Sequence, residues 1–309
     1  MPLQRAIFVL ASPASLRVAA NPNHRDNRVP VVPMSVTAEF PGKATFVFVD
    51  ADNLALQAWE PRTLADTPTT GLGEADVHVW LLQLQQPPHT LEDLATSLTE
   101  EELARSSRFH LERDRKRFIA ARSLLRQLVG RYAGMPANAV RFLANSHGKP
   151  RIETEEGLAA FEFNLSHSGD WAVVGFARGV AVGVDIEQIR PVPDMADVAG
   201  HTFAASEAKS IEALPDDQRI DGFFSCWTRK EAYVKAVGLG LSVDLKTFNV
   251  HVTPTRHVDN IRYPETGAAY RVEGLRPLQG YLSAIAVEIP GAATGVVASR
   301  PLKHFALAV

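Results

Sequence analysis

The chain has 309 residues, 46% hydrophobic and 22% charged, which is the composition of a folded protein with a sizeable core. A net charge of -3 argues against a nucleic-acid binder, and Cys226, the one cysteine, excludes both an internal disulfide and a cysteine-based zinc cluster. No apolar run approaches the ~20 residues that span a bilayer, so we expect a cytoplasmic protein of about two domains that binds neither membrane nor nucleic acid.

The first 74 residues are rich in Pro, Ala, Asn and Thr. They contain one strand-like run, "ATFVFVD" at 44–50, and the segment 60–76 is typical of a linker. The apolar run at 6–11 is short and Arg17 follows it, which does not match a signal peptide. We therefore expect an N-terminal extension and linker over 1–74.

The next segment begins with "VHVWLLQL" at 77–84, whose partial alternation predicts a strand. Short helical pieces should follow, since Thr99 and Glu102 have the spacing of a capping box. The strongest helix signal is at 113–134, where apolar residues recur at helical spacing and a glycine stands at the end.

Several strands are expected after that helix. "VRFLANSHGKPRI" (140–152) indicates a strand and a turn, "FEFNLSHSGDWAVVGFA" (161–177) two strands around a polar loop, and "GVAVGVDIEQI" (179–189) another strand. A second helical stretch is predicted over 203–219, and a third through "FSCWTRKEAYVKAV" (224–237).

The last predicted strands are "KTFNVHV", "AAYRVE" and "YLSAIAVE", in an antiparallel sheet. Each half of the chain thus combines a long helix with several strands, which predicts an α+β fold and permits a distant duplication. We place the two subdomains at 75–181 and 182–300.

An acidic pair stands in the strand "VGVDIE". Residues two apart in a strand point to one face, so Asp185 and Glu187 project together while Val184 and Ile186 point into the core. Two close carboxylates repel each other unless a cation neutralises them, and Mg²⁺ prefers oxygen ligands of this kind. The alternative is a strand end that carries two solvated acids.

A second stripe lies on the third helix, where Trp227, Glu231 and Lys235 follow one another at intervals of four residues and share one face. Glu231 could supply another oxygen ligand to a metal, and Lys235 could meet a phosphate. A solvated Glu–Lys pair beside an aromatic anchor would have the same spacing, and would contribute only ~0.3–0.5 kcal/mol.

The segment "FNLSHSGDWA" places Ser166, His167 and Ser168 where a strand should pass into a turn, a position in which polar groups can meet an anion. Neighbouring residues of an extended backbone point to opposite faces, so we do not expect a catalytic Ser–His couple here. His167 is either a phosphate contact or an ordinary turn histidine.

Basic residues gather around the first long helix and in "HGKP", and most of them should form a solvated face. We expect one or two of this group to touch a ligand: Arg105, Arg113, Arg115, Lys116, Arg117, Arg122, Arg126 and Lys149.

Taken in order, "GKP", "FNLSHS", "GVDIE" and "WTRKEAYVKAVGLGL" resemble the 4′-phosphopantetheinyl transferase superfamily, in its large, broad-specificity type that activates nonribosomal peptide and polyketide synthases. The resemblance covers about 77–288. It implies a monomeric pseudo-dimer of two similar α+β subdomains with the active site in the cleft between them.

The resemblance also implies roles for individual residues. The metal ligands would be Asp185, Glu187 and Glu231, and the catalytic residues Glu231, Lys235 and Asp185. The contacts to coenzyme A would come from Arg105, His147, Gly148, Lys149, Asn164, Leu165, Ser166, His167, Asp185, Glu231 and Lys235. A further basic position used in the family is Glu102 here, so that contact should be missing.

The implied reaction moves the phosphopantetheine arm of coenzyme A to a serine of an acyl or peptidyl carrier protein. Mg²⁺, or Mn²⁺ in its place, would be the metal, and 3′,5′-ADP would be released. Two alternatives stay open at this point: a Mg²⁺-dependent nucleotide phosphohydrolase, and an inactive module that binds a carrier protein or coenzyme A.

Overall fold

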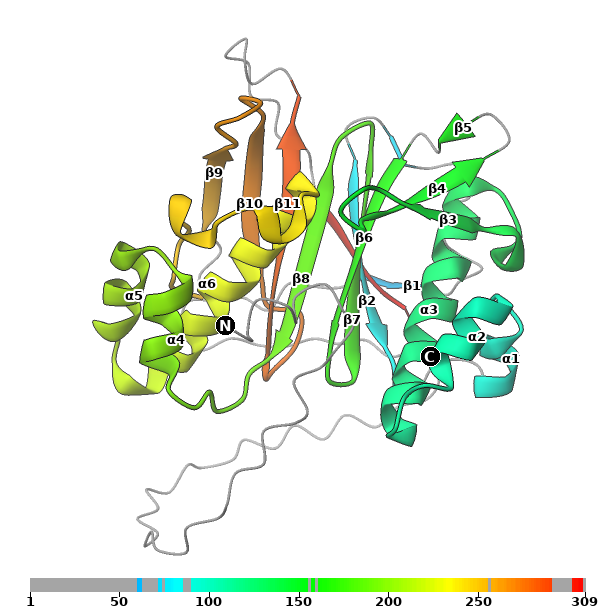
Figure 1. The fold of residues 1–309 in the computed structure, drawn as a ribbon, viewed down its shortest axis with the longest axis horizontal. Coiled ribbons are helices and arrows are strands. Elements are labelled where there is room, and N and C mark those ends of the chain that lie inside the picture. The colour runs from blue at the N-terminus through cyan, green and yellow to red at the C-terminus, as the bar shows by residue number, and fades with distance from the viewer. Residues whose placement is uncertain are drawn as a thin grey trace, which may run out of the picture.

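The computed structural model consists of two facing β-sheets whose outer sides are covered by helices (Figure 1). The residues that the structure describes are 60–62, 72–73, 76–85, 90–154, 157–158, 161–254, 257–290 and 302–307. The strand-like run at 44–50 lies outside them. Within them, no helix combines the length and the apolar character that crossing a membrane requires.

The first sheet has the strand order β1-β12-β2-β7-β6. Its members are β1 (Glu60–Arg62), β2 (Val77–Gln83), β6 (Phe161–Ser168), β7 (Trp171–Arg178) and β12 (Leu302–Leu307). The pairings of β7 with β2 and with β6 are antiparallel, whereas β12 runs parallel to both β2 and β1. A smaller sheet beside it contains β3 (Arg141–Ala144), β4 (Pro150–Thr154) and β5 (Gly157–Leu158).

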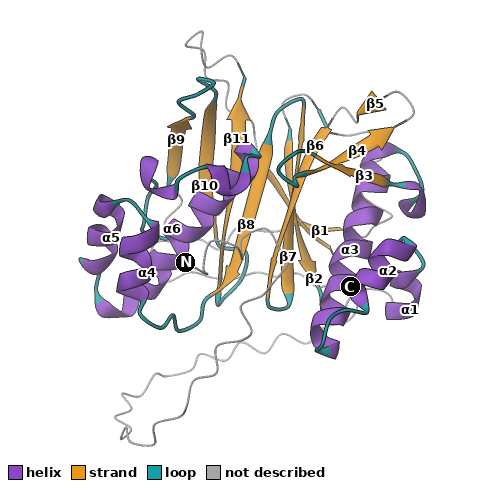
Figure 2. Cartoon of the chain, in the orientation of Figure 1, coloured by secondary structure: helices purple, strands orange, loops and turns teal. Residues whose placement is uncertain are grey.

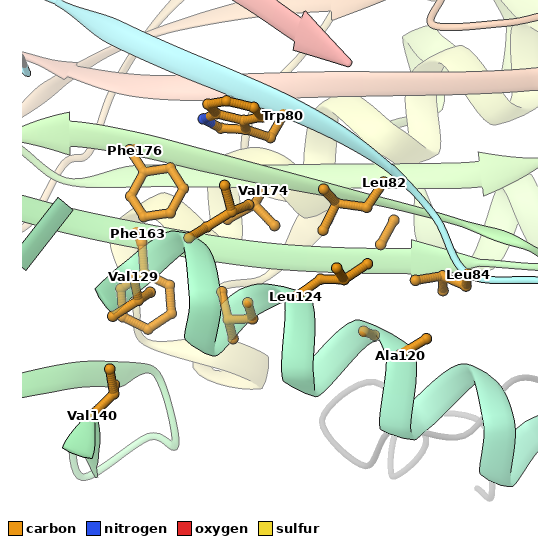
Figure 3. Close-up of a cluster of buried hydrophobic side chains, with 14 of the residues drawn as sticks. Trp80, Leu82, Leu84, Ala120, Leu124, Val129, Val140, Phe163, Val174 and Phe176 are labelled. Atoms are coloured by element: carbon orange, nitrogen blue, oxygen red, sulfur yellow. The ribbon is translucent and has the colours of Figure 1, made fainter. Parts of the chain in front are cut away.

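Helix α3 (Glu112–Ala133) packs on the first sheet, as its apolar spacing predicts. Leu124 and Val129 of α3 face Phe163 and Phe176 of the sheet, and all four are at most 1% exposed (Figure 3). Burying such side chains contributes roughly 1.5–3 kcal/mol each. Two short helices precede it, α1 (Leu91–Ala95) and α2 (Glu100–Ser106), and the predicted capping box is present at the start of α2.

The second sheet has the order β8-β11-β10-β9, and its pairings are antiparallel. Its strands are β8 (Val182–Gln188), β9 (Val258–Arg262), β10 (Ala269–Leu275) and β11 (Tyr281–Ile289). Three helices cover its outer side: α4 (Met195–Thr202), α5 (Ala205–Glu212) and α6 (Asp216–Val237) (Figure 2). Three short 3₁₀ turns complete the chain: η1 (Ala137–Ala139), η2 (Gly240–Ser242) and η3 (Leu245–Thr247).

The two halves repeat one plan, which confirms the predicted α+β fold. The order β2-β7-β6 corresponds to β8-β11-β10, and each set is packed against a helix of 22 residues. Each of these helices ends at a left-handed glycine, Gly134 (φ 69°) and Gly238 (φ 77°), a conformation that costs glycine little.

Two predicted elements differ in the structure. The helical stretch 203–219 divides into α5 and the start of α6, because Pro215 caps the new helix. The strand expected at 246–252 is absent, and β9 (Val258–Arg262) takes the edge of the sheet instead. In that segment the amide of Val250 donates to the Glu207 carboxylate at 2.7 Å, and the amide of His251 donates to the Asp259 carboxylate. These amides therefore bond to side chains and not to the backbone of a neighbouring strand.

The structure also adds strands near the boundaries expected for the subdomains. β1 lies inside the segment predicted as a linker, and β12 lies beyond residue 300. Both join the N-terminal sheet, so the chain returns to its first half at its end. The boundaries 75–181 and 182–300 themselves stay a prediction.

Candidate active site

The acidic pair projects from β8 as the alternation predicts. Val184 and Ile186 are fully buried in the apolar cluster between the two sheets. Asp185 and Glu187 point to the other side of the strand, where Asp185 is 3% exposed. The strand therefore buries a carboxylate that water does not solvate, and this carboxylate needs a compensating charge.

Helix α6 supplies that charge because it lies directly on β8. Gly183 makes this possible: a Cβ there would overlap the backbone of Ala232 and of Ala236. The close approach brings Glu231, which precedes Ala232, and Lys235, which precedes Ala236, over the acidic strand. Trp227, at the first position of the stripe, packs against Phe203 and Phe223 and anchors the helix, as expected.

Two side chains, one from each half, meet at Asp185. Lys235 Nζ lies 2.6 Å from Asp185 Oδ1, and Ser166 Oγ of β6 donates to the same oxygen at 2.7 Å. Lys235 also donates to Ser166 at 3.0 Å. Asp185 Oδ2 is buried without a hydrogen-bond partner in the part of the chain that the structure describes. One oxygen of this carboxylate is therefore saturated, and the other is left for a ligand.

The neighbouring carboxyl groups have perturbed acidities. Burial, followed by the charge of Asp185, raises the pKa of Glu187 to about 7. Burial also raises the pKa of Glu231 to about 7, against the opposing charge of Lys235. Burial lowers the pKa of the Lys235 ammonium, but the negative charges of Asp185 and Glu231 outweigh it, so that the pKa is raised. The cluster holds more negative than positive charge and favours a further cation.

A divalent ion fits the donor set. All three acids offer hard oxygen ligands of the kind that Mg²⁺ prefers, and the orphaned Asp185 Oδ2 is a free ligand atom. Among the described residues, no three His, Cys, Asp or Glu side chains are gathered as a ready-made metal site. In this structure the ammonium of Lys235 is the positive charge that pairs with Asp185.

The segment 166–168 lies within β6, whereas a strand-to-turn position was expected. β6 continues to Ser168, which pairs with Trp171 and closes a two-residue turn. Ser166 therefore faces β8. Burial lowers the pKa of His167 to about 4, and the positive charges of Lys235 and Arg117 lower it further. His167 and Ser166 are neighbours on an extended strand, so their side chains point to opposite faces and form no couple.

The "HGKP" turn joins the halves at the other end of β8. Asn145 organises it, accepting from the amides of His147 and Lys149 and donating to the carbonyl of Gly238 at 3.1 Å. Lys149 is buried, and its ammonium donates to the carbonyls of Val182 at 3.0 Å and Ala236 at 3.3 Å. Burial lowers the pKa of Lys149 to about 8.

A cavity of about 370 Å³ opens beside this turn and is lined by both halves. Its charged lining residues are Lys149, Arg151, Glu162 and Glu288. Asp185, Glu187 and Glu231 do not line this cavity. Among the described residues, the two halves therefore meet at two polar regions: the acidic cluster and the cavity beside the "HGKP" turn.

Other residues of the predicted set lie apart from Asp185. Arg105 is exposed on α2 and stacks over Phe118, with 5.5 Å from its guanidinium carbon to the ring centroid. Leu165 packs against the N-terminal core. Glu102 is buried and ion-paired with Arg122 and Arg126, so it can make no contact with a phosphate.

The contacts that three residues make near the site were not predicted from the sequence: those of Asn145, Ser168 and Ser283. Ser283 of β11 donates to the backbone carbonyl of Asp185 at 2.5 Å. Ser168 donates to Glu187 at 2.7 Å. The spacing of Ser166 and Ser168, two residues apart on one strand face, matches that of Asp185 and Glu187 and was a usable signal.

Comparison with known proteins assigns this arrangement to a family. A model of the 4′-phosphopantetheinyl transferase superfamily matches residues 181–286, and one of the N-terminal part of 4′-phosphopantetheinyl transferase matches 85–177. The 4′-phosphopantetheinyl transferase HetI of Nostoc sp. is 35% identical over 229 residues, 74% of this chain and 93% of that protein.

Two similar relatives come from bacilli. The 4′-phosphopantetheinyl transferase psf-1 of Bacillus pumilus is 31% identical over 206 residues, which cover 67% of this chain and 85% of that protein. The 4′-phosphopantetheinyl transferase Sfp of Bacillus subtilis is 28% identical over 193 residues, 62% of this chain and 83% of that protein. The chain therefore belongs to the 4′-phosphopantetheinyl transferase superfamily. It is an enzyme of this class, as the motifs predict.

Proposed function

We propose that this enzyme transfers the 4′-phosphopantetheine arm of coenzyme A to a serine hydroxyl of an acyl or peptidyl carrier protein and releases 3′,5′-ADP. The observation that carries the proposal is the cluster of Asp185, Lys235 and Ser166, which brings a ligand-ready carboxylate and a cation together at the junction of the two halves. A pyrophosphate needs both kinds of group.

Glu231 is the general base in this proposal. Its pKa of about 7 leaves a substantial fraction ionised at neutral pH, which suits a group that must take a proton from a serine hydroxyl. The serine oxygen forms a bond to the β-phosphorus of coenzyme A, and the phosphoanhydride bond to 3′,5′-ADP breaks. Lys235, held in its charged form, stabilises the negative charge that develops on the departing phosphate.

The metal in this proposal is Mg²⁺, or Mn²⁺, held by Asp185, Glu187 and Glu231. When bound, it supplies neutralisation of the phosphate charge and in-line orientation of the reacting groups. The free Oδ2 of Asp185 and the raised pKa values of the two glutamates support this assignment, since both features favour an added cation.

The nucleotide contacts implied by the sequence remain part of the proposal. Ser166 is next to the cluster, and His167 follows it on β6. The other proposed contacts to coenzyme A are Arg105, His147, Gly148, Lys149, Asn164 and Leu165. Monomeric state and cytoplasmic location also stay predictions.

The test is mass spectrometry of an apo carrier protein after incubation with the enzyme, coenzyme A and Mg²⁺. A phosphopantetheine adduct is expected, and Asp185→Ala and Glu231→Ala should each abolish it. Asp217→Ala is the matched control: it removes an exposed acid from the same helix and should leave the adduct intact.

The other outcomes separate the alternatives. Hydrolysed coenzyme A beside an unmodified carrier protein would identify a phosphohydrolase. Binding of coenzyme A without either product would indicate an inactive binding module.

A further inference from the structure

The two carboxylates of β8 are each held by a serine from the opposite half. Ser166 donates to Asp185 Oδ1 at 2.7 Å, and Ser168 donates to Glu187 Oε2 at 2.7 Å. Both serines lie on β6 and both acids on β8, and each pair has the two-residue spacing of one strand face. The contacts therefore form two successive rungs between the edges of the two sheets.

The direction of the Ser168 hydrogen bond is fixed by its second partner. The backbone N–H of Gln188 donates to Ser168 Oγ at 3.1 Å, so the hydroxyl hydrogen is directed to Glu187. This donation favours the ionised carboxylate and engages Oε2. Oε1 is then the oxygen of Glu187 that can serve another ligand.

The turn after Ser168 is packed tightly against the C-terminal half. Gly169 has φ 56°, and a Cβ there would lie 2.6 Å from the hydroxyl of Tyr281 and 2.7 Å from the amide oxygen of Gln188. Only a glycine fits this position without displacing its neighbours. The hairpin therefore fixes Ser168 against β8.

We propose that Ser168 is a positioning residue that orients Glu187 for the metal. The inference rests on the proposed role of Glu187 as a magnesium ligand and adds the group that holds this ligand. Ser168 lies in the N-terminal half and Glu187 in the C-terminal half. Formation of the metal site consequently depends on docking of the two halves, and neither half provides the oriented ligand alone.

The test measures Mn²⁺ binding to the full chain in the presence of coenzyme A. Free Mn²⁺ is counted by electron paramagnetic resonance, and a titration of coenzyme A without protein is subtracted. Ser168→Ala should weaken Mn²⁺ binding by about tenfold or more, the usual effect of removing a group that orients a metal ligand. Ser168→Thr retains the hydroxyl and should restore most of the affinity.

Ser97→Ala is the matched control. Ser97 belongs to the N-terminal half and is buried, whereas Ser168 is half-buried. The Ser97 hydroxyl donates to Leu94 O at 2.9 Å and lies 2.8 Å from Ser123 Oγ, far from β8 along the chain. Loss of this buried hydroxyl should lower the thermal stability but leave Mn²⁺ binding unchanged. The metal concentration that gives half-maximal transfer should rise in Ser168→Ala and not in Ser97→Ala.

The outcomes separate the positioning role of Ser168 from the proposed metal-binding role of the three acids. Failure of the wild-type protein to bind Mn²⁺ would overturn the metal role of the three acids. Wild-type binding that Ser168→Ala leaves unchanged would overturn the positioning role alone. If Ser168→Ala does not fold, Ser168→Thr decides, because wild-type affinity supports the role of the hydroxyl and affinity as weak as that of Glu187→Gln contradicts it.

Discussion

Lys149 is a buried cation whose nearest partners are backbone carbonyls rather than acids. Its ammonium donates to Val182 on β8 and to Ala236 on α6, while the Glu162 carboxylate is 4.0 Å away. Carbonyl dipoles compensate a charge less well than a carboxylate does, so desolvation dominates and the pKa falls to about 8. The residue ties the first half to two elements of the second.

This environment predicts a stability that depends on pH. The folded pKa of about 8 lies below the ordinary value of 10.5, so between these values the unfolded chain binds more protons. The cost of burying the charged lysine is therefore present in full below pH 8 and is relieved as pH rises through this window. Relative to Lys149→Met, the wild type should gain about 1–2 kcal/mol in unfolding free energy between about pH 8 and about pH 10.

Urea unfolding at the two pH values measures this difference. Lys116→Met is the control, because Lys116 is exposed and pairs with Glu112 on the surface of α3. Its difference from the wild type should not change with pH. An unchanged difference for Lys149→Met as well would show that the buried lysine keeps an ordinary pKa.

At the scale of residues, the faces that the metal and base candidates share could be predicted because each residue lies in a regular element. Strand alternation gave Asp185 and Glu187 a common face, and helical spacing gave the same to Glu231 and Lys235. Periodicity does not show which carboxylate oxygen lacks a hydrogen-bond partner. The orphaned Oδ2 of Asp185 arises from contacts between residues 19 and 50 positions apart in the chain.

At the scale of elements, the site depends on the distance between α6 and β8. Gly183 lets the backbone of the helix touch the strand, so that Lys235 reaches Asp185. A methyl group at this position would press on the main chain of α6 at Ala232 and Ala236, which can yield only if the whole helix shifts.

Gly183→Ala should therefore destabilise the protein by roughly 3 kcal/mol and reduce phosphopantetheine transfer together with it. Gly200→Ala makes the same chemical change in α4, where a Cβ would meet nothing within 4 Å. That variant should be as stable as the wild type or slightly more so. Urea unfolding and the carrier-protein assay check both. Equal stability of the two variants would mean that α6 moves freely over β8.

The element predictions failed where side chains replaced backbone pairing. "KTFNVHV" has the alternation of a strand, and Val250 and Val252 are indeed buried. Its amides, however, bond to Glu207 and Asp259, and these partners are remote in sequence or come from a later strand. Periodicity predicts which residues are buried, but it does not identify the acceptor of each amide.

At the scale of the whole molecule, two similar halves meet through an apolar core with a polar margin. The valines of β2, β7 and β8 fill the space between the sheets. Along the edge, Asn164 accepts from the amide of Val184 at 2.9 Å, and the two serine–carboxylate pairs follow. The order of predicted elements permitted a duplication. The position of the acids at the shared margin followed only from the packing of the halves.

The N-terminal sheet also depends on a segment from the far end of the chain. β12 pairs with β2 in parallel over five positions, from Leu302 opposite Val77 to Ala306 opposite Leu81. β1 adds only the three residues Glu60–Arg62 outside β12. Removal of β12 would expose the ladder groups of β2, whose Val77 and Val79 are fully buried.

Deletion of residues 301–309 should therefore lower the melting temperature by about 5 °C or more and promote aggregation, since an apolar strand edge becomes open. Deletion of 1–74, which removes β1 and leaves β12 on β2, should have a smaller effect and retain carrier-protein modification. Deletion of 1–59, which keeps β1, is the reference that isolates the effect of removing 60–74. Differential scanning calorimetry with the transfer assay compares the three. If the loss of 1–74 proved more damaging than the loss of 301–309, the pairing of β12 with β2 would not be what holds this edge of the sheet.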